Sequence, residues 1–376
     1  MRIAVNTRLL LPDRLDGIGW YTYETLKRIT VAHPEHEFFF FFDRPYSPEF
    51  IFSGNIQPVI LSPPARHPVL WVIWFEQSVA KSLKKHKADV FVSPDGYLPL
   101  KSNVPSIAVI HDINFHHRPQ DLPLADRLYY RNYFPKFADK ATRIVTVSNY
   151  SKQDICNSYG IPDEKVKVVY NGAGENYKPV SGEAATETRK KYSSGLPYFV
   201  FVGTLHPRKN VARLLRAFDG FRRSFPEPYK MVIVGERMFM TGEIEQAIKQ
   251  IQFSNDIVFT GRLSPEELRY VLGSATALTF VPLFEGFGIP VVEDMYCDTP
   301  VMASNVTSLP EVAGDAALYV DPFNVPAILA GMEQLAGNDN LRAGLIAKAR
   351  SHRTKFTWDK SAEGLWEEIE ALLNIK

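Results

Sequence analysis

The chain has 376 residues, of which 45% are hydrophobic and 23% are charged, and its formal net charge is +1. This length suits two domains better than one core, and the near-neutral charge gives no whole-chain attraction to nucleic acid. Only two cysteines occur, so neither a disulfide framework nor a zinc cluster is expected.

The N-terminal end of the chain carries no sign of targeting or membrane insertion. The first predicted strand starts at Arg2, which leaves no room for a cleaved signal. The longest apolar runs, Phe38–Phe42 and Val69–Phe75, are much shorter than the roughly 18–20 residues that span a bilayer. We therefore expect a cytoplasmic protein. Residues 1–172 carry 21 Lys and Arg against 17 Asp and Glu, which leaves peripheral contact with an anionic inner membrane face open.

Residues 1–172 alternate short apolar runs with longer helical patterns, which is typical of a parallel sheet covered on both faces. In a doubly wound sheet of this kind, ligands bind beyond the carboxyl ends of the strands. The strands are predicted at Arg2–Asn6, Glu37–Phe42, Pro58–Leu61, Asp89–Val92, Ser106–His111 and Arg143–Val147, and the helices at Trp20–Val31, Trp71–Lys85, Leu124–Ala138 and Tyr150–Tyr159.

Two strand ends in this half carry candidate site residues. Gly17 and Gly19 follow the first strand after a ten-residue excursion. That spacing does not fit a dinucleotide-binding fingerprint, but it fits a loop that faces a phosphate or a sugar, with a simple tight turn as the alternative. His111 ends a strand, and Asp112 beside it can orient the imidazole ring. A hydrogen-bonded structural histidine is the alternative at this position.

The alternation is interrupted around Tyr170–Pro179, where Asn-Gly, Gly and Pro indicate turns, and the residues up to Gly195 are polar. The domain boundary is therefore predicted after residue 172. The pattern then restarts with strands at Tyr198–Val202, Met231–Val234, Ile257–Thr260, Ala277–Val281, Val301–Ala303 and Leu318–Val320, and helices at Val211–Ser224, Glu243–Ile251, Pro265–Gly273, Pro290–Tyr296, Pro326–Leu335, Asn340–Lys355 and Trp358–Leu373.

Loops after two strands of the second half carry cations. Arg208 and Lys209 follow the first strand and open a helix, where they can form charge-assisted hydrogen bonds with a diphosphate. A solvated basic turn is the alternative. Arg262 and Leu263 follow the third strand, and their backbone groups can hold a nucleobase. Since the carboxyl ends of parallel strands meet at one edge, we expect these loops to converge.

The most informative stretch is Val281–Glu293, which reads VPLFEGFGIPVVE. Gly286 and Gly288 leave backbone N–H groups accessible to an anion, and the helix that starts next adds positive potential. Glu285 and Glu293 flank this cradle, which suits a ligand with a phosphate and vicinal hydroxyls. The alternative is that Glu285 is a solvated loop residue and that Glu293 only complements its helix dipole.

The run Glu-Gly-Phe-Gly, followed by Glu293, resembles the Glu-x7-Glu signature of retaining nucleotide-sugar glycosyltransferases with the GT-B fold, in particular glycosyltransferase family 4. The resemblance covers most of the chain and is densest in the second half. It implies an α/β protein of two Rossmann-like, doubly wound domains facing a central cleft. Residues 1–172 would form the acceptor domain, residues 173–357 the nucleotide-sugar donor domain, and residues 358–376 a helix crossing back to the first domain.

The same resemblance implies roles for individual residues. Glu285 matches the glutamate that holds donor sugar hydroxyls, and Glu293 the one that accepts hydrogen bonds from the ribose. His111 with Asp112 looks like the pair beside the donor sugar, and Arg208 with Lys209 like the basic pair on the diphosphate. The remaining positions matched to the substrate site are Gly17, Gly19, Thr204, Arg262, Leu263, Gly286, Phe287, Gly288 and Ile289.

One position departs from the family pattern. Many members carry arginine where this chain has Thr204, so charge compensation of the diphosphate rests more on Arg208, Lys209 and the backbone. No Asp-x-Asp run occurs, which agrees with transfer that needs no metal and no other cofactor. We expect front-face transfer, in which the departing phosphate oxygen helps to deprotonate the acceptor hydroxyl and His111 shapes the site.

The predicted function is a retaining hexosyltransferase of polysaccharide biosynthesis that acts on a glycan or a lipid-linked sugar. The His-Pro-Arg-Lys-Asn form favours GDP-mannose as the donor, with a UDP-hexose as the runner-up. Two alternatives stay open at the level of sequence. One is a GT-B nucleotide-sugar epimerase, and the other is a catalytically silent protein that binds sugar nucleotides.

Overall fold

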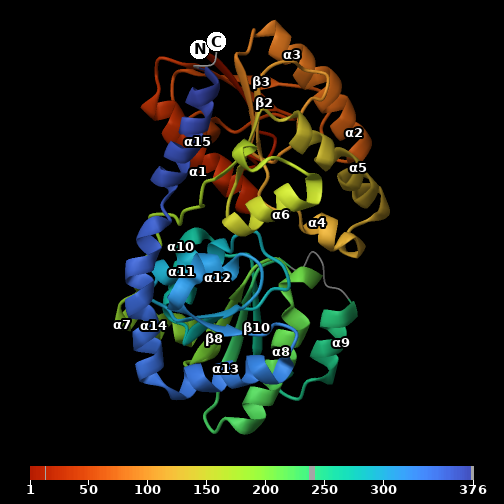
Figure 1. Cartoon of the computed structure of the whole chain (residues 1–376). Helices are drawn as coiled ribbons and strands as arrows, with labels where there is room; N and C mark the ends of the chain where they lie inside the picture. The colour runs from red at the N-terminus through yellow and green to blue at the C-terminus, as the bar shows by residue number, and fades with distance from the viewer. Residues whose placement is uncertain (13, 237–241, 374–376) are drawn as a thin grey trace. The chain divides into compact units, whose positions relative to one another are not determined.

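A computed structural model describes residues 1–12, 14–236 and 242–373, and the chain divides into two compact units. Unit 1 comprises Met1–Gly172 and Thr357–Lys376, and unit 2 comprises Ala173–Phe356. Each unit is built on a parallel sheet with helices packed around it (Figure 1). Among the described residues, no helix combines the length and the apolar character needed to cross a membrane.

The described part of unit 1 contains a seven-stranded parallel sheet in the order β3-β2-β1-β4-β5-β6-β7. The inner strands β2, β1, β4, β5 and β6 are buried on both faces, so they are almost continuous apolar runs, whereas the edge strands β3 and β7 are partly exposed. The strands are β1 (Arg2–Asn6), β2 (Glu37–Phe42), β3 (Ile56–Ile60), β4 (Val90–Ser93), β5 (Ser106–Val109), β6 (Arg143–Thr146) and β7 (Val166–Val168), and the helices are α1 (Gly17–Ala32), α2 (Pro68–Ile73), α3 (Ala80–Lys85), α4 (Asn114–His117), α5 (Leu124–Lys140), α6 (Asn149–Tyr159) and α15 (Trp358–Leu373).

Helix α15, from the far end of the sequence, belongs to unit 1 and lies along α1 (Figure 1). Its apolar face is buried, with Leu365 and Ile369 almost fully covered. Asp359 accepts a hydrogen bond from Nε of Arg28 in α1, at 2.6 Å. The two segments of unit 1 pack tightly against each other where the first ends and the second begins. A Cβ at Gly172 would lie 2.3 Å from the backbone N of Trp358. Unit 1 is therefore completed by a segment that follows unit 2 in sequence.

The described part of unit 2 contains a six-stranded parallel sheet in the order β10-β9-β8-β11-β12-β13. The strands are β8 (Tyr198–Val202), β9 (Lys230–Val234), β10 (Ile257–Gly261), β11 (Ala277–Phe280), β12 (Val301–Ser304) and β13 (Ala317–Val320). The helices are α7 (Gly182–Ser193), α8 (Val211–Ser224), α9 (Gly242–Gln250), α10 (Pro265–Gly273), α11 (Ile289–Tyr296), α12 (Leu309–Ala313), α13 (Val325–Gly337) and α14 (Asp339–His352).

The predicted α/β class with two doubly wound sheets is confirmed. The sequence pattern missed β7, which is three residues long, and helices α4, α7 and α12. Helix α7 was missed for a physical reason. Its buried residues are Thr188 and Ser193, so it presents no apolar stripe from which a helix is recognised.

Both sheets have a point at which the winding direction reverses, and ligands in open α/β sheets bind at such points. In unit 1 it lies between β1 and β4, and in unit 2 between β8 and β11. The loops that follow these four strands are therefore the first places to search for a site.

Candidate functional site

In unit 2 the loops that follow β8 and β11 are bonded to each other at the reversal point of the sheet. The backbone N of Leu283 donates to the carbonyl of Arg208 at 2.7 Å. The side-chain amide of Asn210, which is buried, donates to the carbonyl of Val281 at 2.9 Å. These contacts bring together the two loops that the sequence singled out, and they bring Arg208 and Lys209 up to Glu285.

Glu285 holds both cations through a single carboxylate oxygen. Its Oε2 lies 2.6 Å from Nζ of Lys209 and 2.9 Å from Nη1 of Arg208. The three side chains are mostly buried, with exposed fractions of 13%, 10% and 22% for Glu285, Lys209 and Arg208. Burial alone would raise the pKa of Glu285, but Lys209 and then Arg208 outweigh it and hold the pKa below its ordinary value. The carboxylate is ionised, and the group of three carries a net positive charge that attracts an anion.

The backbone of Glu285 is fixed by the segment that follows β12. The Oγ of Ser308, which is fully buried, donates to the carbonyl of Glu285 at 2.8 Å. The backbone N of Glu285 donates to Oγ1 of Thr307 at 3.3 Å, and Thr307 has a left-handed φ of 57°. Neither residue was predicted as part of the site. Their contribution is to position the loop, so the side chain of Glu285 keeps its direction.

The glycine loop leads into α11 as the sequence indicates. Gly288 is the N-cap of α11 with a φ of 97°, and a Cβ there would lie 2.6 Å from Cδ2 of Leu309. Only glycine fits both the conformation and the space. Ile289 is the first residue of the helix, and Gly286 lies beside Glu285 in the loop. The ring of Phe287 is buried and packs edge-on against Phe356, so any ligand contact from this residue comes from its backbone.

Glu293 projects from the second turn of α11 and is half-buried. Burial raises the pKa of Glu293 to about 7, although a hydrogen bond with Tyr177 partly opposes the shift. At neutral pH the carboxyl group is therefore divided between its charged and neutral forms, and it can accept or donate a hydrogen bond.

Next to Glu293, Asp294 is fully buried, and neither of its carboxylate oxygens has a hydrogen-bond partner among the residues that the structure describes. Burial, followed by the charge of Glu293, raises the pKa of Asp294 well above its ordinary value. The folded protein keeps this proton at pH values where the unfolded chain has lost it. Stability therefore falls as pH rises above the unfolded pKa of about 4.

Replacing Asp294 with asparagine is expected to stabilise the protein at pH 7.5, because the amide has no proton to release in the unfolded state. We expect a gain of about 1 kcal/mol or more, because each unit of the pKa shift corresponds to about 1.4 kcal/mol. The gain should shrink towards pH 4. Urea denaturation at both pH values measures it, with Glu245→Gln on the exposed face of α9 as the control. An equal effect at both pH values would show that Asp294 is ionised in the folded state.

The remaining predicted residues of unit 2 lie at neighbouring strand ends. Thr204 is exposed directly after β8, and Arg262 and Leu263 follow the edge strand β10. The Nη1 of Arg262 lies 4.0 Å from Oε1 of Glu236, a long contact between partly exposed groups. These residues share the carboxyl edge of the sheet with Lys209.

In unit 1 the reversal point carries a buried polar cluster that the sequence did not predict. Arg8, which follows β1, donates from Nε to Oδ2 of Asp95, which follows β4, at 2.6 Å. Asn6 donates to the other oxygen of Asp95 at 2.8 Å. The guanidinium of Arg8 also lies over the ring of Tyr97, 4.4 Å from its centroid. Arg8 and Asp95 are polar residues that follow two adjacent strands, and this position could have indicated the cluster.

His111 follows β5 in the same unit, and its Nε2 lies 2.8 Å from the carbonyl of Pro94. A carbonyl only accepts, so Nε2 carries the hydrogen. Burial lowers the pKa of His111, which leaves the ring neutral and Nδ1 as an acceptor at neutral pH. Asp112 accepts from the backbone N of Asn114 at 2.9 Å, so Pro94 rather than Asp112 orients the imidazole.

The two predicted glycines of unit 1 lie at the start of α1. Gly17 is its first residue, and the N–H of Gly19 donates to Oδ1 of the N-cap Asp16 at 2.9 Å. A Cβ at Gly19 would lie 3.1 Å from the carbonyl of Leu9, which is a tight contact. The loop after β1 therefore passes close to the N-terminus of α1. A helix N-terminus can present its backbone N–H groups to an anion.

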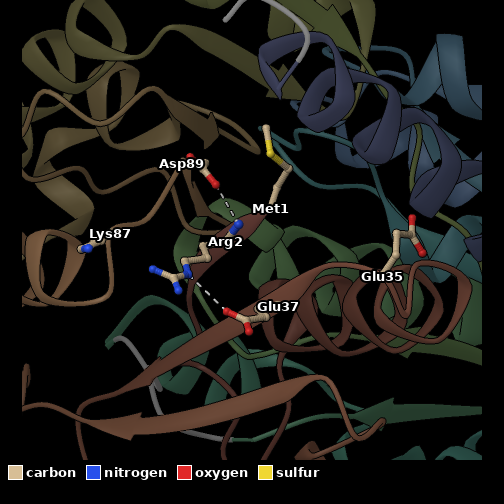
Figure 2. A pocket seen from close by; sticks show the side chains of 6 residues that line it. All are labelled: Met1, Arg2, Glu35, Glu37, Lys87 and Asp89. Carbon is tan, nitrogen blue, oxygen red and sulfur yellow. Dashed lines mark hydrogen bonds and ion pairs between the residues drawn. The ribbon is translucent and has the colours of Figure 1, made fainter.

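A surface pocket in unit 1 lies at the wrong edge of the sheet for a ligand site of this fold. Figure 2 shows its lining residues, which lie at the amino ends of β1, β2 and β4 and on the connection from α1 to β2. The backbone N of Arg2 donates to Asp89 at 2.9 Å, and the side chain of Arg2 pairs with Glu37 at 3.3 Å, both near the surface. The pocket is lined by Met1, Arg2, Glu35, Glu37, Lys87 and Asp89.

Comparison with known proteins agrees with the geometry of both units. Residues 15–174 match the family described as Glycosyltransferase Family 4, and residues 185–352 match Glycosyl transferases group 1. O-antigen chain mannosyltransferase B of Escherichia coli is 28% identical over 356 residues, which cover 92% of this chain and 93% of that protein. The serotype-specific mannosyltransferase WbdA of Escherichia coli is 26% identical over 253 residues, 66% of this chain but only 31% of WbdA.

Among solved structures, sucrose-phosphate synthase from Thermosynechococcus elongatus superposes over the whole of both chains with a TM-score of 0.82. The sequences are 16% identical, so this likeness shows the fold alone.

Proposed function

Because the chain belongs to the group 1 glycosyltransferases of family 4, with the GT-B fold, we propose that it is a retaining hexosyltransferase. Its proposed donor is GDP-mannose, and its proposed acceptor is a glycan or a lipid-linked sugar. The observation that carries the proposal is the cluster of Arg208, Lys209 and Glu285 at the reversal point of the unit 2 sheet. The choice of mannose is supported by the 28% identical relative, which is a mannosyltransferase.

In this proposal unit 2 binds the donor. Arg208 and Lys209 pair with the diphosphate, and the backbone of Gly286 to Ile289 presents N–H groups to it at the start of α11. Glu285 accepts hydrogen bonds from hydroxyls of the sugar, and Glu293 from the ribose. Arg262 and Leu263, at the end of β10, are assigned to the nucleobase.

The chemical step is proposed to take place on one face of the sugar. The bond between the anomeric carbon and the phosphate oxygen breaks, and the acceptor oxygen bonds to the same carbon from the same side. The acceptor proton passes to the departing phosphate oxygen. The two cations stabilise the charge that develops on the diphosphate, which is the role that a metal ion has in other transferases. His111, with Nδ1 as an acceptor, is assigned to contact with the sugar hydroxyls.

Binding of nucleotides tests the donor assignment. A ligand at 100 times its Kd that binds only the native state adds about 2.7 kcal/mol, enough to raise the Tm of a chain of this length by roughly 3–4 °C. We expect GDP to raise the Tm in the presence of EDTA more than UDP or ADP does, with GMP as the control that lacks the second phosphate. A larger shift with UDP would replace GDP-mannose by a UDP-hexose, and no shift with any diphosphate would contradict the proposal.

The reaction itself is then followed with GDP-mannose and a panel of mannose-ended acceptors in EDTA. Retention is read from the anomeric signals of the product by NMR. Conversion of a sugar nucleotide without any acceptor would identify an epimerase. Binding without turnover across the panel would identify a silent sugar-nucleotide-binding protein.

A further inference from the structure

The connection from α1 to β2 in unit 1 is a tight turn with the sequence His33-Pro-Glu-His36. His33 is the C-cap of α1, and the backbone N of His36 donates to the carbonyl of His33 at 3.3 Å. A proline in the second position suits a reverse turn because its φ is already set. The turn brings the first and fourth side chains, both imidazoles, close to the carboxylate between them.

The three side chains present one ligand atom each to a common point. Nδ1 of His33 lies 3.5 Å from Oε1 of Glu35, and Nε2 of His36 lies 3.2 Å from the same oxygen. All three ligand atoms lie within 4.8 Å of one another. Nitrogen and oxygen ligands at about 2.0–2.1 Å from a tetrahedral zinc ion are separated by roughly 3.3–3.4 Å. The two short separations therefore match the edges of a zinc coordination tetrahedron.

The turn is held in place by residues outside it. The side-chain amide of Asn55 donates to three carbonyls, those of Thr30, His33 and His36, at 3.1, 3.0 and 3.1 Å. The ring of His33 stacks on Trp366 of α15, with centroids 3.6 Å apart and planes 16° from parallel. The backbone and one imidazole are therefore fixed in advance, as the residues that support a metal site usually ensure.

An ordinary surface ion pair accounts poorly for this arrangement. The side chain of Glu35 is 61% exposed, and an exposed pair contributes little.

The outer nitrogen of His36 has a partner of its own, the amino group of Met1, at 3.3 Å from Nδ1. Zinc bound at Nε2 would place the ring proton on Nδ1, so this contact with the amino group would have to change when the metal binds.

We propose that His33, Glu35 and His36 bind a divalent transition-metal ion, with zinc as the best fit and water in the fourth position. Two imidazoles and one carboxylate suit zinc and its neighbours and do not suit magnesium or calcium, which prefer oxygen ligands only. The group lies at the amino end of β2, and not at the carboxyl ends where ligands of this fold bind. We assign the ion a structural role, because it would join the α1–β2 turn to α15 through the stacked His33.

The test uses the full chain without a histidine tag, stripped with EDTA and dialysed. Titration with ZnCl2 in the presence of a chelating indicator should show one tight equivalent and a rise in Tm, and Co2+ should give the absorption bands of a tetrahedral site. Glu35→Gln and His36→Gln are each expected to weaken zinc binding by at least tenfold and to remove the rise in Tm. The Tm of Glu35→Gln in EDTA should equal that of the wild type in EDTA, because this side chain is exposed.

His67→Gln is the matched control, since it removes an exposed histidine of unit 1 outside the turn and should leave zinc binding unchanged. Unchanged zinc affinity in both Glu35→Gln and His36→Gln would place the metal elsewhere and overturn the proposal. The absence of any tight equivalent in the wild type would do the same. Sugar transfer in EDTA is a separate readout, so failure of the metal site leaves the proposed reaction standing.

Discussion

Lys209→Ala is expected to lower kcat/KM for sugar transfer by about 10²–10³-fold, the usual effect of removing one preorganised group that stabilises transition-state charge. Nζ of Lys209 is buried at the reversal point of the unit 2 sheet and is aimed into the loop that carries Glu285. The affinity for the nucleoside diphosphate should fall about 10–100-fold, because one charge-assisted hydrogen bond to phosphate is lost. Steady-state kinetics and calorimetric titration with GDP measure the two effects.

Lys191→Ala is the matched control for this variant. Lys191 is an exposed lysine of α7 that also pairs with a glutamate, Glu267, at 3.0 Å. Its replacement should leave both parameters unchanged. In Lys209→Ala the carboxylate of Glu285 keeps its contact with Arg208, so the fold should persist, and circular dichroism verifies it. Unaltered transfer by a folded Lys209→Ala protein would remove the basis of the proposed donor site.

Glu285→Gln is expected to lower the rate of transfer by a similar factor of about 10²–10³. Unlike Lys209→Ala, it should not weaken nucleotide binding. The amide keeps the shape of the side chain and removes the negative charge that both cations share through Oε2. Arg208 and Lys209 then have their full charge available for the diphosphate. We therefore expect GDP to bind as tightly as in the wild type or a few-fold more tightly, while kcat falls.

The control for Glu285→Gln is Glu267→Gln, which neutralises the partner of Lys191 at the surface. Lys209→Ala is expected to weaken GDP binding and Glu285→Gln is not. This difference distinguishes a cluster that binds the diphosphate from one that only stabilises the loop. If the two variants weakened GDP binding equally, the cluster would serve the folding of the loop and not the diphosphate. The double variant would then show no additional loss.

The parts of the site that were predictable from sequence are those with a local signal. Gly288 stands where a helix begins with a proline in its first turn, and the left-handed φ of 97° confirms why glycine is required there. The long-range pairing was not predictable in detail. Arg208 and Lys209 meet Glu285 across 77 and 76 positions of sequence, and no pattern specifies that both cations bind the same oxygen.

The same limit explains what was missed in unit 1. Arg8 and Asp95 are 87 positions apart and lie in different loops, so the buried pair emerges only from the sheet order. The two cysteines predict no zinc cluster, and no motif in the sequence marks the histidines of the α1–β2 turn as ligands. The two imidazoles converge because of the reverse turn and because Asn55 holds the turn in place. Composition and motif spacing do not reveal either feature.

The two-segment construction of unit 1 has a consequence for the order in which the protein matures. Helix α15 covers α1, yet it is translated only after all of unit 2. During synthesis unit 2 can reach its native state while α1 still lacks its cover. Apolar surface of α1 therefore stays accessible to chaperones until α15, with Leu365 and Ile369, has been synthesised and packs against it.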